Sequence, residues 1–229
     1  MKSVKKIIFI KLPLALILLS VLWVVILRWV PVYYTPLMLK RSVQYSKDED
    51  FRTRKKWVSL EKISPDVIKA VVASEDNRFF EHKGFDYEEI KKMLAEHNER
   101  GTKLRGCSTI SQQTAKNVFT WCSDTWIRKA VEAYYAFLIE NIWGKKRIME
   151  VYLNVAEMGK GIYGAEAASG YYFNKKASQL SRREAISLAV ILPTPLRSNP
   201  AKPSSYLNGR IGQISARMYQ IAYPDWIGK

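Results

Sequence analysis

The carboxylate of Glu75 is the strongest single candidate for acid–base chemistry in this chain. It lies four residues after Val71 and three after Val72, so in a helix it would continue their apolar stripe. Burial on that face and the negative end of the helix dipole would both raise the pKa of Glu75 toward the range of a general base. A last helical turn that faces solvent fits the same spacing, so the pattern alone leaves both interpretations open.

A second group of candidates surrounds the start of a helix predicted over residues 109–119. Thr109 and Gln112 form a capping-box pattern, and the free amides at such a helix start would form an anion site. Farther along, Gln113 and Lys116 are three residues apart and form a donor-rich edge, although a solvated helix face has the same composition. The candidate substrate-binding residues of this block are Ser108, Thr109, Gln112, Gln113, Lys116 and Asn117.

Arg128, Lys129 and Glu132 form a third group, inside a helix predicted over residues 125–142. Arg128 and Glu132 are four residues apart and share one helix face, in the weaker of the two orientations for an ion pair. An exposed helical pair of this kind contributes only about 0.3–0.5 kcal/mol. By itself the pattern fits a surface ion pair and a binding site equally well.

Two other motifs do not indicate a site. The string from Gly159 to Gly164 matches the G-x-G-x-x-G pattern of dinucleotide-binding proteins, but that fingerprint follows a strand, and residues 148–158 have a helical pattern. We predict a tight turn between helices there. His82 and His97 are the only histidines, and neither has a second ligand at metal-binding spacing, so zinc is not expected.

The elements that would position these groups are almost all helices. Ser64 is a favourable N-cap and Pro65 a favourable first helical residue, and together they mark the start of the helix that ends at Glu75. No alternating run is long enough for a sheet. The sequence therefore predicts one all-α, mostly helical domain without internal repeats. The predicted helices cover residues 65–75, 86–97, 109–119, 125–142, 146–157, 164–171, 181–192 and 207–222, with a mobile loop over 97–106.

The N-terminal residues predict a membrane anchor. Lysines precede an apolar stretch over residues 12–27, and Arg28 follows it. The positive-inside rule would place Met1 in the cytoplasm and the rest of the chain outside it. A cleaved signal peptide is the competing interpretation, but no good cleavage site precedes Pro31. The predicted organisation is a cytoplasmic tail and transmembrane helix over 1–30, a juxtamembrane connection over 31–62 and a folded domain over 63–229.

The charge balance predicts an anionic partner. The chain has 37 Lys+Arg against 21 Asp+Glu, a net charge of +16, and residues 1–30 hold only five of the basic residues. Outside the cytoplasm no nucleic acid is expected, so a lipid-linked phosphate or an anionic bilayer surface is the favoured partner. Cys107 and Cys122 could pair in an oxidising compartment, but two cysteines do not prescribe a disulfide.

Five ordered motifs closely resemble those of the peptidoglycan glycosyltransferases, glycosyltransferase family 51. They are Glu75-Asp76-x-x-Phe79-x-x-His82-x-Gly84-x-Asp86, Ser108-Thr109-Ile110-Ser111-Gln112-Gln113-x-x-Lys116-Asn117, Arg128-Lys129-x-x-Glu132, Glu150-x-Tyr152-Leu153-Asn154 with the turn at Gly159, and Arg182-Arg183-x-Ala185 running to Pro193. One departure is Cys107, where the pattern has glycine or another small residue. The chain ends too soon after the last motif for a transpeptidase domain, so the resemblance is to the monofunctional, membrane-anchored form.

This resemblance implies a lysozyme-like helical fold behind one transmembrane helix and an enzyme that polymerises lipid II, the lipid-linked disaccharide-peptide precursor. It implies Glu75 as the general base toward the acceptor sugar hydroxyl, with inversion at the anomeric carbon. Glu132 would be the second catalytic carboxylate, acting near the leaving pyrophosphate through a divalent cation, Mg²⁺ or Mn²⁺, or by orienting Arg128. No other cofactor is expected. The groups suited to binding pyrophosphate are Lys116, Arg128, Lys129 and the amides near Ser108.

The implied partners are lipid II, the nascent glycan strand, membrane lipids and proteins of cell-wall synthesis or division. The implied location is the cytoplasmic (inner) membrane, with the catalytic domain on its periplasmic or extracytoplasmic side. Two other classes stay open. A muramidase or lytic transglycosylase would share the fold and a lone catalytic Glu, but would not need cations at the leaving group. A membrane-anchored adaptor that only binds anionic lipid would tolerate Glu75→Asp.

Overall fold

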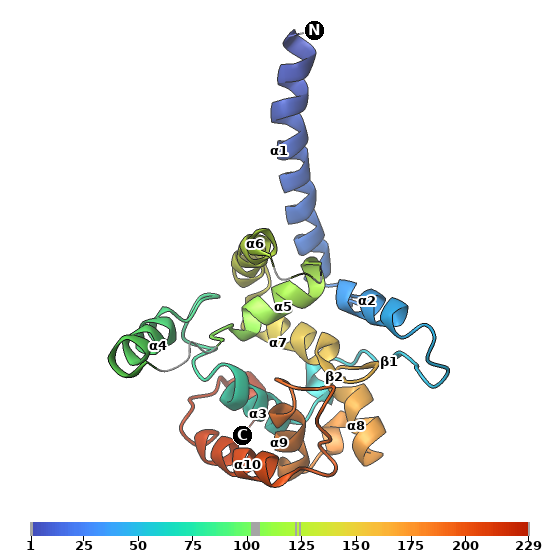
Figure 1. Ribbon diagram of the computed structural model, residues 1–229, viewed down its shortest axis with the longest axis vertical. Coiled ribbons are helices and arrows are strands. Elements are labelled where there is room, and N and C mark those ends of the chain that lie inside the picture. The colour runs from blue at the N-terminus through green and yellow to red at the C-terminus, as the bar shows by residue number, and fades with distance from the viewer. Residues whose placement is uncertain (1, 102–105, 122, 124, 229) are drawn as a thin grey trace.

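The N-terminal helix α1 (Lys2–Leu27) stands away from the rest of the molecule as a single rod (Figure 1). The computed structural model describes residues 2–101, 106–121, 123 and 125–228, with side chains from Lys11 onward. Within that part of the chain, no helix combines the length and the apolar character that crossing a membrane requires. The predicted span is therefore not confirmed and stays a prediction.

The body of the molecule consists of two groups of packed helices, and the mostly helical prediction is confirmed. In one group α5 packs against α6 and α7, and in the other α3 and α10 pack against α9. Fully buried apolar side chains fill both groups, including Val67 and Val71 of α3 and Leu153 of α7. The bounds of these helices are α3 Pro65–Glu75, α5 Ile110–Phe119, α6 Trp126–Ile142, α7 Gly144–Val155, α9 Arg182–Val190 and α10 Ser205–Arg217.

Other helices lie around these groups (Figure 1). Helix α4 lies on one side of the body and α2 on the other, and α8 lies below β2 in this view. The described residues also contain three single turns of 3₁₀ helix. The bounds are α2 Pro36–Gln44, α4 Tyr87–Arg100, α8 Ala165–Phe173, η1 Leu60–Lys62, η2 Ala177–Gln179 and η3 Asp225–Ile227.

A small three-stranded sheet corrects the expectation that no sheet would form. Its strands are β1 (Arg54–Lys55), β2 (Glu157–Gly159) and β3 (Ile162–Tyr163), in the order β1-β3-β2. β3 pairs parallel with β1 and antiparallel with β2. Strands of two or three residues are too short to show period-two alternation, which is why the pattern missed them. The predicted turn between helices is therefore a β-hairpin.

The glycine that closes this hairpin is required by its surroundings. Gly164 has φ +82°, and a Cβ at this position would lie 2.8 Å from the backbone oxygen of Asn154. The backbone of α7 and the start of α8 therefore approach each other more closely than any side chain would allow.

Several predicted helix boundaries need correction. Ser64 occupies the N-cap position of α3, as predicted, and Pro65 is the first helical residue. The side chain of Ser64, however, makes no capping hydrogen bond. Helix α4 continues to Arg100 and ends at Gly101, which has a left-handed φ of +61°. The first part of the predicted loop is therefore helical, and residues 102–105 lie outside the described residues.

Side-chain hydrogen bonds, in addition to the covalent connection, hold the end of helix α1 against the body of the molecule. The indole Nε1 of Trp143 donates to the backbone oxygen of Val24 at 2.8 Å. The guanidinium of Arg147 donates to the backbone oxygens of Leu27 at 2.8 Å and of Val30 at 2.6 Å. These bonds satisfy carbonyls that a helix end leaves open, so the end of α1 is held against α6 and α7.

Candidate active site

The carboxylate of Glu75, the last residue of α3, is held by two hydrogen bonds. Ser74 Oγ donates to its Oε1 at 3.2 Å, and Gln113 Nε2 donates to its Oε2 at 3.0 Å. Burial is the largest influence on its pKa and raises it, the two hydrogen bonds and the charge of Arg210 lower it, and Asp76 raises it further. The net pKa is raised, as predicted, so this carboxylate has the properties of a general base.

Gln113 fixes the direction of that carboxylate because both ends of its amide are engaged. The hydroxyl of Tyr152 donates to Gln113 Oε1 at 3.1 Å, which leaves the amide nitrogen to face Glu75. Tyr152 is fully buried in α7, and its pKa lies well above the usual value, first because of burial and then because of nearby Glu75 and Asp76. Tyr152 therefore stays a neutral donor, and α3, α5 and α7 are joined through one polar chain.

Asp76, the next residue after Glu75, attaches the end of α3 to the start of α5. Its carboxylate accepts from the backbone amide of Ile110 at 2.9 Å and from His82 Nε2 at 2.9 Å. Aspartate thereby occupies one of the open amides at the helix N-terminus. His82 thus helps to hold the Asp76 carboxylate at the start of α5.

The predicted capping box at the start of α5 is confirmed. Thr109 Oγ1 accepts from the amide of Gln112, and the Gln112 side chain accepts from the amide of Thr109. Thr109 also donates to the backbone oxygen of Gly84 at 2.6 Å. Because these bonds engage both side chains inside the protein, the structure gives Thr109 and Gln112 a role in holding the helix start.

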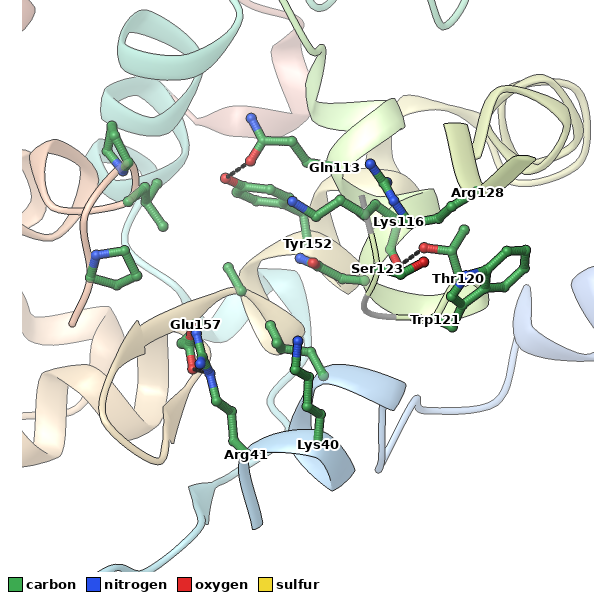
Figure 2. Close-up of a pocket in the computed structure, with 16 residues that line it drawn as sticks. Lys40, Arg41, Gln113, Lys116, Thr120, Trp121, Ser123, Arg128, Tyr152 and Glu157 are labelled. Carbon is green, nitrogen blue, oxygen red and sulfur yellow. Dashed lines mark hydrogen bonds and ion pairs between the residues drawn. The ribbon is translucent and has the colours of Figure 1, made fainter. Parts of the chain in front are cut away.

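Figure 2 shows a cleft into which cationic side chains from three helices extend. Its volume is about 410 Å³, and Lys116 of α5, Arg128 of α6 and Lys40 of α2 line it, together with Gln113. Asn117 lines it as well. Lys116 is exposed to solvent, which suits a side chain that meets an anionic ligand. Two of the three predicted cations, Lys116 and Arg128, therefore line the same cleft, whereas Lys129 does not.

A second cavity has a volume of about 320 Å³. Glu75, Ser108, Thr109 and Arg210 are among the residues that line it. Gln113, the hydrogen-bond partner of Glu75, lines the first cleft instead. The hydrogen bond between Gln113 and Glu75 thus connects a residue that lines one cavity with a residue that lines the other.

Glu132 is a buried ion-pair partner, not a surface residue. Its side chain is 2 % exposed, and it accepts from Arg128 Nη1 at 2.6 Å and from Lys129 Nζ. Lys129 in turn lies 3.5 Å from Ser108 Oγ. Neither Glu132 nor Lys129 lines either cavity, so Glu132 is connected to the cleft through its ion pair with Arg128.

The contribution of α2 was missed by the sequence interpretation, which assigned residues 31–62 to a connection. Thr35 caps this helix by accepting from the amide of Met38, and Pro36 is its first residue. The Thr-Pro pair was a usable signal for a helix start. On α2, Arg41 forms a two-bond ion pair with Glu157 of β2, at 2.9 and 3.1 Å, which holds α2 against the cleft.

The comparisons with known proteins agree with this geometry. A family model described as Transglycosylase matches residues 41–219. This chain belongs to the transglycosylase family. Curated relatives named biosynthetic peptidoglycan transglycosylase include one from Bacteroides thetaiotaomicron, 56 % identical over 85 % of this chain and 79 % of its own length. Others come from Bdellovibrio bacteriovorus, 49 % identical over 86 % and 78 %, and Pseudomonas aeruginosa, 46 % identical over 91 % and 90 %.

The donor set around Glu132 of this transglycosylase does not fit a divalent cation. Two side-chain cations already occupy the oxygens of this single carboxylate, and their charge would repel a metal ion. Among the described residues no group of three or more acidic, histidine or cysteine side chains could hold a metal. Of the two implied roles for Glu132, orienting Arg128 is the one that this geometry favours. The pairing of Cys107 with Cys122 is untested, because Cys122 lies outside the described residues.

Proposed function

We propose that this transglycosylase polymerises peptidoglycan glycan chains from lipid II. It transfers the growing lipid-linked glycan to the 4-hydroxyl of the GlcNAc unit of lipid II and releases undecaprenyl pyrophosphate. The observation that carries the proposal is Glu75, a carboxylate of raised pKa that lines one cavity and is hydrogen-bonded to Gln113 in the lining of the cation-lined cleft. Two cavities whose linings are linked by a hydrogen bond of the proposed base suit a reaction that joins two large substrates.

The reaction proceeds as a displacement with inversion. The acceptor oxygen forms a bond to the anomeric carbon of the donor while the bond from that carbon to the pyrophosphate oxygen breaks. Glu75 takes the hydroxyl proton, and the pyrophosphate leaves with the bonding electron pair. Pyrophosphate is a weak base, so its departure needs neutralising charge rather than a proton, and Lys116 and Arg128 in the cleft supply that charge.

Incubation of the purified protein with lipid II and, separately, with finished glycan strands tests the proposal. We expect polymer to grow from lipid II and finished strands to keep their length. Shortening of the strands would identify a muramidase or lytic transglycosylase, and binding without either reaction would identify an adaptor. The same assay with a chelator and with added Mg²⁺ or Mn²⁺ tests the metal requirement, and the donor set at Glu132 predicts activity with the chelator present.

We further propose that residues 1–30 anchor this domain in the cytoplasmic membrane, with the site on the extracytoplasmic side. The lysines before residue 12 and the apolar sequence after it support this topology. Helix α6 contacts α1 through a hydrogen bond of 2.8 Å between Tyr134 and Ser20, and three large apolar side chains of α6 remain exposed. They are Trp126, 90 % exposed, Ile127, 71 %, and Phe137, 58 %.

Fractionation of cells that express the full chain tests the anchor. We expect the protein in the membrane fraction after an alkaline carbonate wash, with the domain digested by protease added from outside the cytoplasmic membrane. Release by the wash, or protection from the protease in intact spheroplasts, would contradict the proposed anchor or its orientation.

A further inference from the structure

Helix α10 brings two arginines to the end of α3 that carries Glu75. Arg210 and Arg217 are seven residues apart, so they lie on the same face of α10 two turns from each other. Nη1 of Arg217 donates to the backbone oxygen of Ala73 at 3.0 Å. This bond occupies a carbonyl in the last turn of α3 and fixes α10 beside it. Both helices pack on α9, which keeps this arrangement rigid.

The cavity beside Glu75 is lined by three arginines, and two of them have structural partners. Arg78 forms ion pairs with Glu81 at 2.7 Å and with Asp86 at 3.2 Å. Arg217 donates to the backbone oxygen of Ala73. Arg210 is half-buried and lines the same cavity. Within the part of the chain that the structure describes, no hydrogen bond or ion pair engages its guanidinium. Its charge nevertheless acts on Glu75 and lowers the pKa of that carboxylate against the effect of burial.

We propose that Arg210 binds an oxyanion of the acceptor substrate and thereby places the acceptor hydroxyl at Glu75. A guanidinium presents a planar set of donors that pairs with a phosphate or a carboxylate through two hydrogen bonds. The cations Lys116 and Arg128 lie in the other cavity and serve the donor. Each of the two anionic substrates needs a cation to bind it. In the cavity that Glu75 lines, Arg210 is the arginine whose guanidinium can bind the acceptor.

This inference rests on the proposed polymerase function. Lipid II offers two sources of the oxyanion, the pyrophosphate of the lipid link and the carboxylates of the stem peptide. Glu75, Asp86 and Glu89 also line the cavity and would repel either anion. The arginine offsets that repulsion, so its removal weakens acceptor binding more than it slows the transfer itself.

A single-transfer assay with Arg210→Gln separates acceptor binding from donor binding. The labelled donor is lipid II with its own 4-hydroxyl blocked, so that it cannot act as an acceptor, and the acceptor concentration is varied. We expect the KM for acceptor to rise about tenfold or more, the loss expected for charge-assisted hydrogen bonds, while kcat changes only a few-fold. Arg210→Lys keeps the charge without the planar donors and should restore part of the affinity.

Arg183→Gln is the matched control. Arg183 also contacts α10, through Asn208 at 2.8 Å, but does not line the cavity. We expect its acceptor KM to equal that of the wild type. An acceptor KM for Arg210→Gln that matches the wild-type value would overturn the inference. If the wild-type protein itself transfers nothing, the proposed function fails instead, so the two failures can be told apart.

Two modified acceptors identify the oxyanion. One has its stem-peptide carboxylates amidated, and the other has a neutral linkage in place of pyrophosphate. With one of these acceptors, the KM of Arg210→Gln should equal that of the wild type. The group that this acceptor lacks is the one that Arg210 binds. A third acceptor lacks both kinds of anion. If Arg210→Gln raises the KM for this acceptor as much as it raises the KM for unmodified lipid II, Arg210 does not bind an acceptor oxyanion.

Discussion

Glu75→Gln is expected to lower the rate of lipid II polymerisation by about 10²–10⁴-fold, the contribution that a positioned general base makes. Glutamine keeps the size of the side chain and can still bond to Ser74 and Gln113, but it cannot accept the acceptor proton. Polymer formation from purified protein under saturating lipid II measures the effect. Glu88→Gln, which changes an exposed carboxylate on α4, is the control and should retain wild-type activity.

The stability of Glu75→Gln separates catalysis from folding. Burial raises the pKa of Glu75, so folding favours its protonated form. This stabilisation is complete below the pKa of the unfolded chain and is lost as the pH rises through the folded pKa. We therefore expect the Tm of Glu75→Gln to equal or exceed that of the wild type at about pH 8, with the difference fading toward about pH 4. An inactive variant that is also unfolded would not support the role of Glu75 as a base.

The pH dependence of wild-type activity follows from the same shift. Only the ionised carboxylate accepts a proton, so the rate should fall as the pH drops through the raised pKa of Glu75. Near-native polymerisation by Glu75→Gln would exclude the proposed base.

Lys116→Ala is expected to lower the polymerisation rate by about 10²–10³-fold, the typical cost of removing one group that stabilises developing negative charge. Lys116 is exposed and lines the cleft, so its loss should leave the Tm unchanged. Lys91→Ala is the matched control, because Lys91 is an exposed lysine on α4 that pairs with the surface residue Glu88. Thermal unfolding and the lipid II assay on the same preparations measure both effects.

Arg128→Ala is expected to lower stability as well as activity, unlike Lys116→Ala. Arg128 lines the same cleft and also pairs with Glu132, whose side chain is 2 % exposed. Its removal leaves that buried carboxylate with Lys129 and should cost about 1.5–3 kcal/mol of stability in addition to activity. An unfolded Lys116→Ala protein would point to a structural role for Lys116 instead.

Much of the fold was predictable because its signals are local. The capping box at Thr109, Pro65 at a first helical position and the apolar stripe before Glu75 each act within one or two helical turns, and the corresponding helices are present. The small sheet was not predictable in this way, because its strands are two or three residues long. The helix that begins after Thr35 was overlooked although its cap was visible.

By itself, the sequence determined the residue types of the site and the helices that carry them. Only the tertiary structure decided that Gln113 and Tyr152 orient Glu75, that Glu132 is buried behind Arg128, and that Arg210 lies beside the base. Helical periodicity places a side chain on a face of its own helix, but it does not say which other helix that face meets. Those contacts depend on how distant helices pack around a shared core, so local spacing could not show whether the Glu75 carboxylate is solvated or lines a cavity.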